Sequence, residues 1–133
     1  MSTRGQTVFI KDIELKTDRL RDIEKNAYCI VYHHWDSYPD GVGEVLKKGI
    51  EMSQNRIKIN DIEYATMNII NYLTNKSRED IEKGNVTGFG ICNELYDDIE
   101  YIYIINMTTK ELKCYEYDFG DHYLGELVFT YQF

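Results

Sequence analysis

The sequence predicts an α+β protein with a single antiparallel sheet of about five or six strands and two or three helices packed on one face. Three observations lead to this expectation. Strand-like runs occupy both ends of the chain, helical periodicity fills the middle, and turn residues separate the runs of the last third as in a meander. No repeat or linker divides the 133 residues, so we expect one domain, with residues 1–5 as a flexible arm.

The first third of the chain contains two predicted strands. Residues 7–15 begin with three apolar β-formers and continue as an alternation of apolar and acidic residues, which predicts a strand that reaches Leu15. Residues 28–32 (YCIVY) have no polar face and predict an interior strand. The charged segment 16–26 between them is either a loop or a helix of one or two turns.

The middle of the chain is predicted to be helical. From Val42 onward apolar residues recur at helical spacing, and Asp40 is the expected N-cap. Gly43 and Gly49 in this helix suit close packing or the approach of a ligand.

Two further helices are predicted at residues 62–73, which carry the clearest apolar stripe, and at residues 78–83. Their expected capping and terminating residues are Asn60 or Asp61 for the first, and a partial capping box of Ser77 and Asp80 with Gly84 as the end for the second.

The last third of the chain has strand composition. The predicted strands are residues 86–92, 99–106, 111–117 and 127–133, with a turn at Thr108 and Thr109.

Charge and composition limit the classes of function. A net charge of −8 and a pI near 4.8 argue against direct nucleic-acid binding and suit a basic partner. No apolar run approaches the ~20 residues that a membrane helix needs, so we expect a cytoplasmic protein without membrane contact. The cysteines Cys29, Cys92 and Cys114 lie in apolar runs, which indicates reduced, buried thiols.

Uncommon residues concentrate in residues 32–43 (YHHWDSYPDGVG). His33 and His34 are adjacent, so on a strand they point to opposite faces and only one can share a site with Asp36. His34 and Asp36 are therefore candidates for a catalytic acid/base pair or for metal ligands. The alternative is a structural hydrogen bond that fixes the loop.

A second candidate is the acidic patch of Glu94, Asp97, Asp98 and Glu100 before the strongest predicted strand. Asp98 and Glu100 would share one face of a strand and are weak candidates for a divalent cation site. The alternative is a solvated turn. Zinc binding by Cys29, His33, Cys92 or Cys114 has only a weak spacing signal, and no other cofactor is expected.

The opening MSTRG, the stretch YHHWDSYPDGVGEVL and the segment TGFGI…DDIEYIYII together resemble a family of small proteins from phages, prophages and bacteria. That family carries a Y-x-H-x-D-G-Y-P motif followed by a helix, and later a D-I/L-E-Y-x-Y motif. The resemblance spans most of the chain in the same order. His34 matches the motif histidine, and Ser37 stands where the family has glycine. The positions that it implies for a site are Arg4, Tyr32, His34, Asp36, Tyr38, Pro39, Asp98, Glu100, Tyr101 and Tyr103.

Members of that family are mostly without assigned activity. Their occurrence in phages implies an anti-defence role, in which the protein inhibits a host immune factor in the cytoplasm of a bacterial host. Together with the acidic charge, this favours a non-enzymatic protein that binds a host protein through acidic and tyrosine-rich surface.

Two alternatives remain open. The first is a metal-dependent hydrolase or nuclease-like enzyme that uses His34, Asp36, Asp98 and Glu100, which requires these side chains to converge. The second is sequestration of a small nucleotide signal, in which Trp35 or Tyr38 stacks on a base. For that second role, the glycines that admit phosphate are Gly41, Gly43, Gly88 and Gly90, and the cations that offset the charge are Arg4, Arg56 and Lys58. A homo-oligomer through the final strand is also open.

Overall fold

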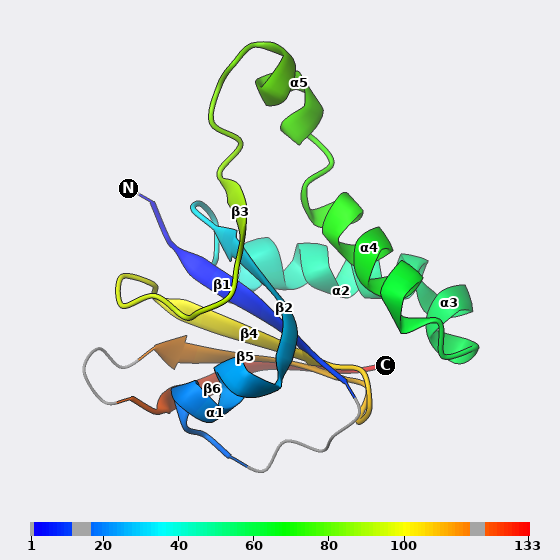
Figure 1. The fold of residues 1–133 in the computed structure, drawn as a ribbon, viewed down its shortest axis with the longest axis vertical. Coiled ribbons are helices and arrows are strands. Elements are labelled where there is room, and N and C mark those ends of the chain that lie inside the picture. Colours follow the sequence, from blue (N-terminus) through cyan, green and yellow to red (C-terminus); the bar gives the residue numbers. More distant parts are fainter. Residues whose placement is uncertain (1, 12–16, 118–121) are drawn as a thin grey trace.

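The computed structural model describes residues 2–11, 17–117 and 122–133, which fold around one six-stranded sheet (Figure 1). The predicted α+β class and single sheet are confirmed. The strands are β1 (Gly5–Ile10), β2 (Ala27–His33), β3 (Phe89–Cys92), β4 (Tyr101–Asn106), β5 (Glu111–Tyr117) and β6 (Leu124–Gln132). The helices are α1 (Leu20–Asn26), the π-helical turn η1 (Pro39–Gly43), α2 (Glu44–Met52), α3 (Gln54–Lys58), α4 (Ile62–Leu73) and α5 (Ser77–Glu82).

The sheet has the strand order β3-β2-β1-β4-β5-β6 and is mostly antiparallel. The central pair β1 and β4 is parallel, which the prediction of a purely antiparallel sheet did not include. The reason lies in the route of the chain. β3 is antiparallel to β2 and β2 is antiparallel to β1, so β3 runs in the direction of β1. Residues 93–100 then carry the chain back along the sheet, and β4 starts beside β1 in that same direction.

The side chain of Gln6 fastens this return segment to the sheet. Its Nε2 donates to the carbonyl of Glu94 at 2.8 Å, and its Oε1 accepts from the backbone N–H of Tyr96 at 2.8 Å. Gln6 is fully buried, so these bonds satisfy an amide that would otherwise cost free energy to bury.

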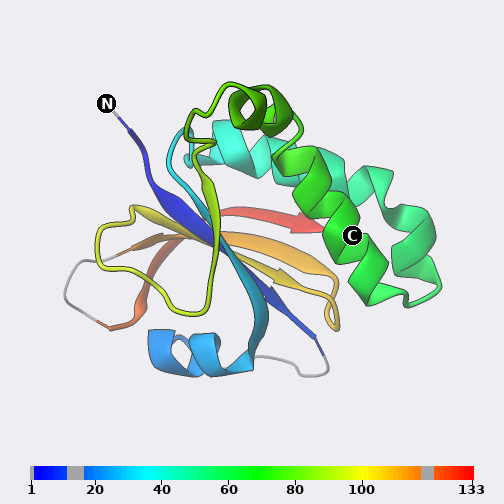
Figure 2. The same cartoon turned by 45° about the horizontal axis from the view of Figure 1, so that its top comes forward.

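Helices cover both faces of the sheet rather than the one face predicted (Figure 2). On one face α2 and α4 pack against a core that includes Phe9, Tyr103 and Ile105. On the other face α1 packs against Val8 and Ile102, among others. The alternation of β1 and β4 explains this arrangement, because both strands place large apolar residues on both faces and each face then needs a cover.

The N-terminal residues are attached to the sheet earlier than predicted. β1 already includes Gly5, and the carbonyls of Thr3 and Arg4 accept hydrogen bonds from the amides of Ser37 and Glu100 at 3.2 and 2.8 Å. Residues 3–5, which were predicted to belong to a flexible arm, are thus hydrogen-bonded to neighbouring segments or paired in the sheet. The end of the first predicted strand, residues 12–15, lies outside the described residues.

The helix ends differ from the predicted caps. Asp40 is inside η1 instead of capping α2, and no side-chain cap bond is present at either helix. Asp61 precedes α4, but its carboxylate accepts from Arg56 at 3.2 Å instead of capping. Ser77 is the first residue of α5, so the predicted capping box is not formed. Gly84 follows α5 with a φ of +73°, which confirms it as the end of that helix.

The predictions about the cysteines and about membrane-spanning helices can also be compared with the fold. All three cysteines are free thiols; Cys114 is buried, whereas Cys29 and Cys92 are half-buried. Within the described part of the chain, no helix combines the length and the apolar character that crossing a bilayer requires.

Gly5 gives a test of the packing at the end of β1. A Cβ at this position would lie 2.8 Å from His33 Cε1 and 2.9 Å from both Ser37 Cβ and the carbonyl oxygen of Tyr101. We predict that Gly5→Ala lowers the free energy of unfolding by about 2 kcal/mol, because these neighbours are held by the sheet and by buried hydrogen bonds. Urea unfolding measures the change.

Gly90→Ala in edge strand β3 is the matched control, because nothing lies within 4 Å of a Cβ there. It should change the stability by less than about 0.5 kcal/mol. Equal losses in the two variants would show that strand glycines are generally required, and that the contact of Gly5 with His33 and Ser37 is not the cause.

Candidate functional site

Residues 32–43 form the junction between β2 and α2. The chain leaves the sheet after His33, and the amide of His34 donates to the carbonyl of Gly88 at 2.8 Å. Asp36 then adopts a φ of +57°, and its carbonyl accepts from the amide of Val42 at 2.7 Å, which closes the turn. A Cβ on Gly41 would collide with the Asp36 carbonyl, so this close turn requires glycine at position 41.

A buried hydrogen-bond network holds this junction. The side chain of His33 is fully buried; its Nε2 lies 2.9 Å from Thr7 Oγ1 and its Nδ1 lies 2.6 Å from Ser37 Oγ. Ser37 Oγ also donates to the carbonyl of His33 at 3.2 Å. Because the Ser37 hydroxyl donates its proton to that carbonyl, its oxygen accepts from Nδ1–H of His33. Thr7 then donates to Nε2, so both nitrogens of the neutral His33 ring have a hydrogen-bond partner.

Tyr103 connects the same junction to β4. Its hydroxyl donates to the carbonyl of Ser37 at 2.6 Å, and its ring packs edge-on against His33 with the centroids 5.8 Å apart. Burial is the main cause that raises the pKa of Tyr103, so the hydroxyl keeps its proton and donates. Ser37, to which Tyr103 and His33 both bond, is fully buried. A glycine at position 37 would leave Nδ1 of His33 without the serine hydroxyl as its partner.

The predicted pair of His34 and Asp36 is not joined by a hydrogen bond. His34 Nδ1 bonds instead to the hydroxyl of Tyr32 at 2.8 Å, and its ring packs edge-on against Trp35. The carboxylate of Asp36 accepts from the hydroxyl of Tyr38 at 3.0 Å. As expected from strand alternation, His33 and His34 have different neighbours, and His33 is the structural one.

The predicted acidic patch contacts the N-terminal residues. Arg4 Nη1 forms an ion pair with Asp98 Oδ2 at 2.8 Å, and both side chains are partly exposed. Tyr32 lies within the electrostatic reach of this pair: burial raises its pKa, Arg4 lowers it and Asp98 raises it. The two candidate regions are thus neighbours through Tyr32. Among the described residues, however, no three His, Cys, Asp or Glu side chains gather as a metal site, so neither the predicted cation cluster nor the zinc set is formed there.

One concave region of the surface is acidic and rich in tyrosine. We call it the acidic groove; its volume is about 550 Å³. It is lined by Thr3, Tyr38, Asp97, Asp98, Ile99, Glu100, Tyr101, Glu116 and Tyr117. The backbone explains this gathering, because Tyr101 at the start of β4 is paired in register with Glu116 near the end of β5.

Carboxylates set the electrostatics of the acidic groove. Burial raises the pKa of Tyr101, and the carboxylates of Glu116 and Glu100 raise it further. Burial likewise raises the pKa of Tyr117, with Asp97 as an additional cause. Within the described part of the chain, Asp98 is the only one of the four lining carboxylates that has an ion-pair partner. The groove therefore has an excess of negative charge beside aromatic rings.

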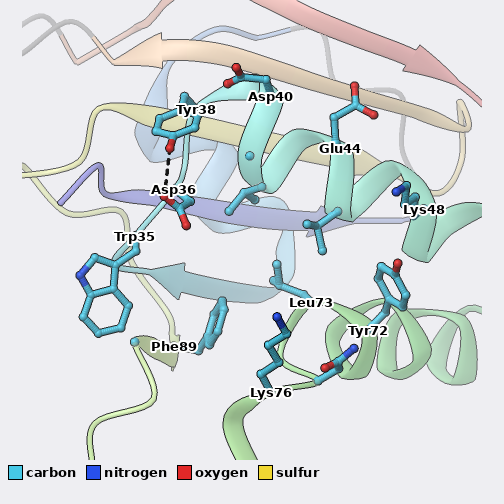
Figure 3. A pocket seen from close by; sticks show the side chains of 15 residues that line it. Trp35, Asp36, Tyr38, Asp40, Glu44, Lys48, Tyr72, Leu73, Lys76 and Phe89 are labelled. Carbon is cyan, nitrogen blue, oxygen red and sulfur yellow. Dashed lines mark hydrogen bonds between the residues drawn. The ribbon is translucent and has the colours of Figure 1, made fainter. Parts of the chain in front are cut away.

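A second concave region lies on the other side of the junction, between η1–α2 and the segment from α4 to β3 (Figure 3). We call it the aromatic cleft; its volume is about 680 Å³. Its lining includes the aromatic side chains Trp35, Tyr38, Tyr72 and Phe89, the lysines Lys48 and Lys76, and the acids Asp36, Asp40 and Glu44. Tyr38 borders both this cleft and the acidic groove.

The predicted site residues are thus divided by the fold, with Pro39 at the start of η1. The acidic groove receives Tyr38, Asp98, Glu100 and Tyr101, and the aromatic cleft receives Trp35 and Asp36 in addition to Tyr38. Arg4 pairs with Asp98 beside the groove, and Tyr32 and His34 bond to each other. Tyr103 is buried and structural.

Several lining residues were not among the predicted site residues. Glu116 and Tyr117 could have been found only from the register of β4 with β5, which no local pattern specifies. Lys48 lies on α2, Lys76 in the turn after α4, and Phe89 at the start of β3. The packing of α4 against α2 brings the two lysines to the same cleft.

No family model, curated protein or solved structure matches this chain.

The buried His33 predicts a pH dependence of stability. Burial lowers the pKa of His33 from 6.5 to about 3. Between pH 6.5 and pH 3, His33 therefore binds a proton in the unfolded chain but not in the folded chain. The contribution of His33 to the free energy of unfolding is complete above pH 6.5 and decreases as the pH falls toward 3. We expect this residue alone to remove about 1 kcal/mol of stability for each pH unit in that window.

The measurement is urea unfolding of the wild type and His33→Gln between pH 7 and pH 4. The variant is less stable at pH 7, because it breaks the bonds to Thr7 and Ser37, but its stability falls less steeply with acid. His122→Gln, which removes an exposed imidazole, should show the same decrease of stability with falling pH as the wild type. Parallel curves for the wild type and His33→Gln would contradict the buried neutral histidine.

Proposed function

We propose that this protein acts without catalysis, by binding a basic segment of a partner protein in the acidic groove. The observation that supports this most is the composition of the groove. Four carboxylates and three tyrosines line about 550 Å³, and among the described residues only Asp98 of those carboxylates is paired with a cation. The net charge of −8 would steer such a partner toward the protein.

The chemistry of the groove suits arginine or lysine side chains. A guanidinium can bind a carboxylate through two parallel hydrogen bonds and can also stack on an aromatic ring. The groove offers both kinds of contact, with Glu116 and Glu100 as carboxylates and Tyr101 and Tyr117 as rings.

The geometry also favours a larger interface around the groove. Tyr38 borders the groove and is 38% exposed. Tyrosine and tryptophan are enriched among the residues that dominate interface energetics. The resemblance to phage and prophage proteins extends the proposal: the partner is a bacterial host immune protein that the bound protein inhibits.

A peptide with two adjacent arginines in an otherwise neutral sequence provides the probe. We predict that Glu100→Gln/Glu116→Gln weakens its binding about tenfold, because two charge-assisted contacts are lost. Fluorescence anisotropy of the labelled peptide, at low and at physiological salt, measures the affinity. Binding by the wild type should weaken as salt rises.

The control is Glu63→Gln/Glu126→Gln, which removes the same charge from exposed positions on α4 and β6. It should weaken binding by no more than about twofold, as expected of general surface charge. Equal losses in the two double variants would show that only the net charge matters and that the groove is not the site.

The same pair of variants tests the natural partner. Immobilised wild-type protein and the Glu63/Glu126 control should retain one and the same basic protein from a bacterial host lysate at low salt, and the Glu100/Glu116 variant should lose it. Retention by all three proteins would contradict the acidic groove as the binding site.

A further inference from the structure

The aromatic cleft combines features that the proposed protein-binding function does not use. It is larger than the acidic groove, at about 680 Å³, and it lies within the range of volumes typical of small-molecule sites. Its lining brings aromatic rings together with two lysines, whereas the acidic groove has tyrosines and carboxylates. This contrast indicates a different class of ligand.

Trp35 forms a positioned platform at one end of the cleft. Its ring lies against Gly88, where any Cβ would collide with it, and Gly88 has a φ of +82°. The His34 ring packs edge-on against it, at a centroid distance of 5.0 Å and an interplanar angle of 87°. Although it is fixed in this way, Trp35 remains 49% exposed, so aromatic surface is left for a ligand. Phe89 lies beside it in Figure 3.

The lysines supply positive charge beyond this platform. In Figure 3 the Lys76 side chain points into the cleft between Phe89 and Tyr72, and Lys48 lies near Tyr72 at the other end. Within the described part of the chain, neither lysine forms a salt bridge with an acidic side chain. Both are therefore available to an anion, which is notable in a chain with a net charge of −8.

The acidic residues of the lining restrict how an anionic ligand can lie. The carboxylate of Asp36 is near the Trp35 end, where it accepts from Tyr38. In Figure 3 the carboxyl groups of Asp40 and Glu44 point away from Lys76. A ligand that places hydrogen-bond donors near Asp36 and its negative group near Lys76 and Lys48 fits this distribution of charge.

From these observations we propose that the aromatic cleft binds a nucleoside monophosphate. The base stacks on Trp35 beside Phe89, the sugar hydroxyls or an exocyclic amine face Asp36, and the phosphate is bound by Lys76, with Lys48 adding positive charge at the far end of the cleft. A simple aromatic acid would leave much of the cleft unfilled and would offer Asp36 no donor. The site is separate from the acidic groove except for the shared edge at Tyr38, and the inference does not rest on the proposed protein-binding function.

Trp35 is the only tryptophan of the chain, so its fluorescence reports directly on this cleft. The probes are adenosine 5′-monophosphate, adenosine and inorganic phosphate, each titrated to millimolar concentration. We expect a saturable change with the monophosphate, affinity about tenfold lower for adenosine, and no saturable change with phosphate alone.

The variants separate the phosphate contact from net charge. Lys76→Gln should lower the affinity for the monophosphate about tenfold and leave the affinity for adenosine unchanged. The control Lys58→Gln removes the same charge from an exposed position on α3 and should leave both affinities unchanged. Both lysines are exposed, and the thermal midpoint of each variant confirms that it remains folded.

Three results would overturn the inference: no saturable response of Trp35 to the monophosphate, equal affinity for monophosphate and adenosine, or equal losses in Lys76→Gln and Lys58→Gln. Glu100→Gln/Glu116→Gln should bind the monophosphate as the wild type does. Its result distinguishes the two proposals, because failure of the peptide to bind the acidic groove leaves this titration unaffected.

Discussion

The arrangement of this molecule depends on one buried histidine. His33 has no exposed surface, and its two ring nitrogens bond to Thr7 in β1 and to Ser37 in the turn that follows β2. The hydroxyl of Tyr103 in β4 holds the carbonyl of the same serine. Three segments far apart in the sequence are therefore fixed to one another by polar groups that water does not reach. Removal of Thr7 or Ser37 would leave a buried ring nitrogen of His33 without its hydrogen bond, which costs more free energy than the loss of a similar apolar contact.

Both candidate surfaces follow from this constraint. Ser37 is held beside the ends of β1 and β2, Asp36 before it adopts a left-handed conformation, and the chain reverses through η1. This reversal places Trp35 against Gly88 on one side and Tyr38 at the edge of the acidic groove on the other. At the junction His34 and Asp36 are not bonded to each other, and each bonds to a tyrosine. We infer that the junction positions two neighbouring binding surfaces.

Several local features of the structure could be predicted from the sequence. Period-two alternation placed His33 and His34 on different faces, and apolar periodicity located α4 at its observed residues. What it could not predict depends on long-range pairing. The parallel pair of β1 and β4 requires the return segment of residues 93–100, which Gln6 holds against the sheet. Glu116 enters the acidic groove only through the register of β4 with β5, and Lys76 reaches the cleft only after α4 packs against α2. A local pattern has no information about such partners.

The most direct test of the central claim is to map the binding site of the two-arginine peptide by backbone amide chemical shifts of isotope-labelled protein. We expect the largest changes at residues 97–101 and 116–117, which line the acidic groove, and small changes at Lys48 and Lys76. Changes spread over exposed acids elsewhere, such as Glu63 and Glu126, would contradict a defined site and would show that the peptide senses only the net charge of the protein.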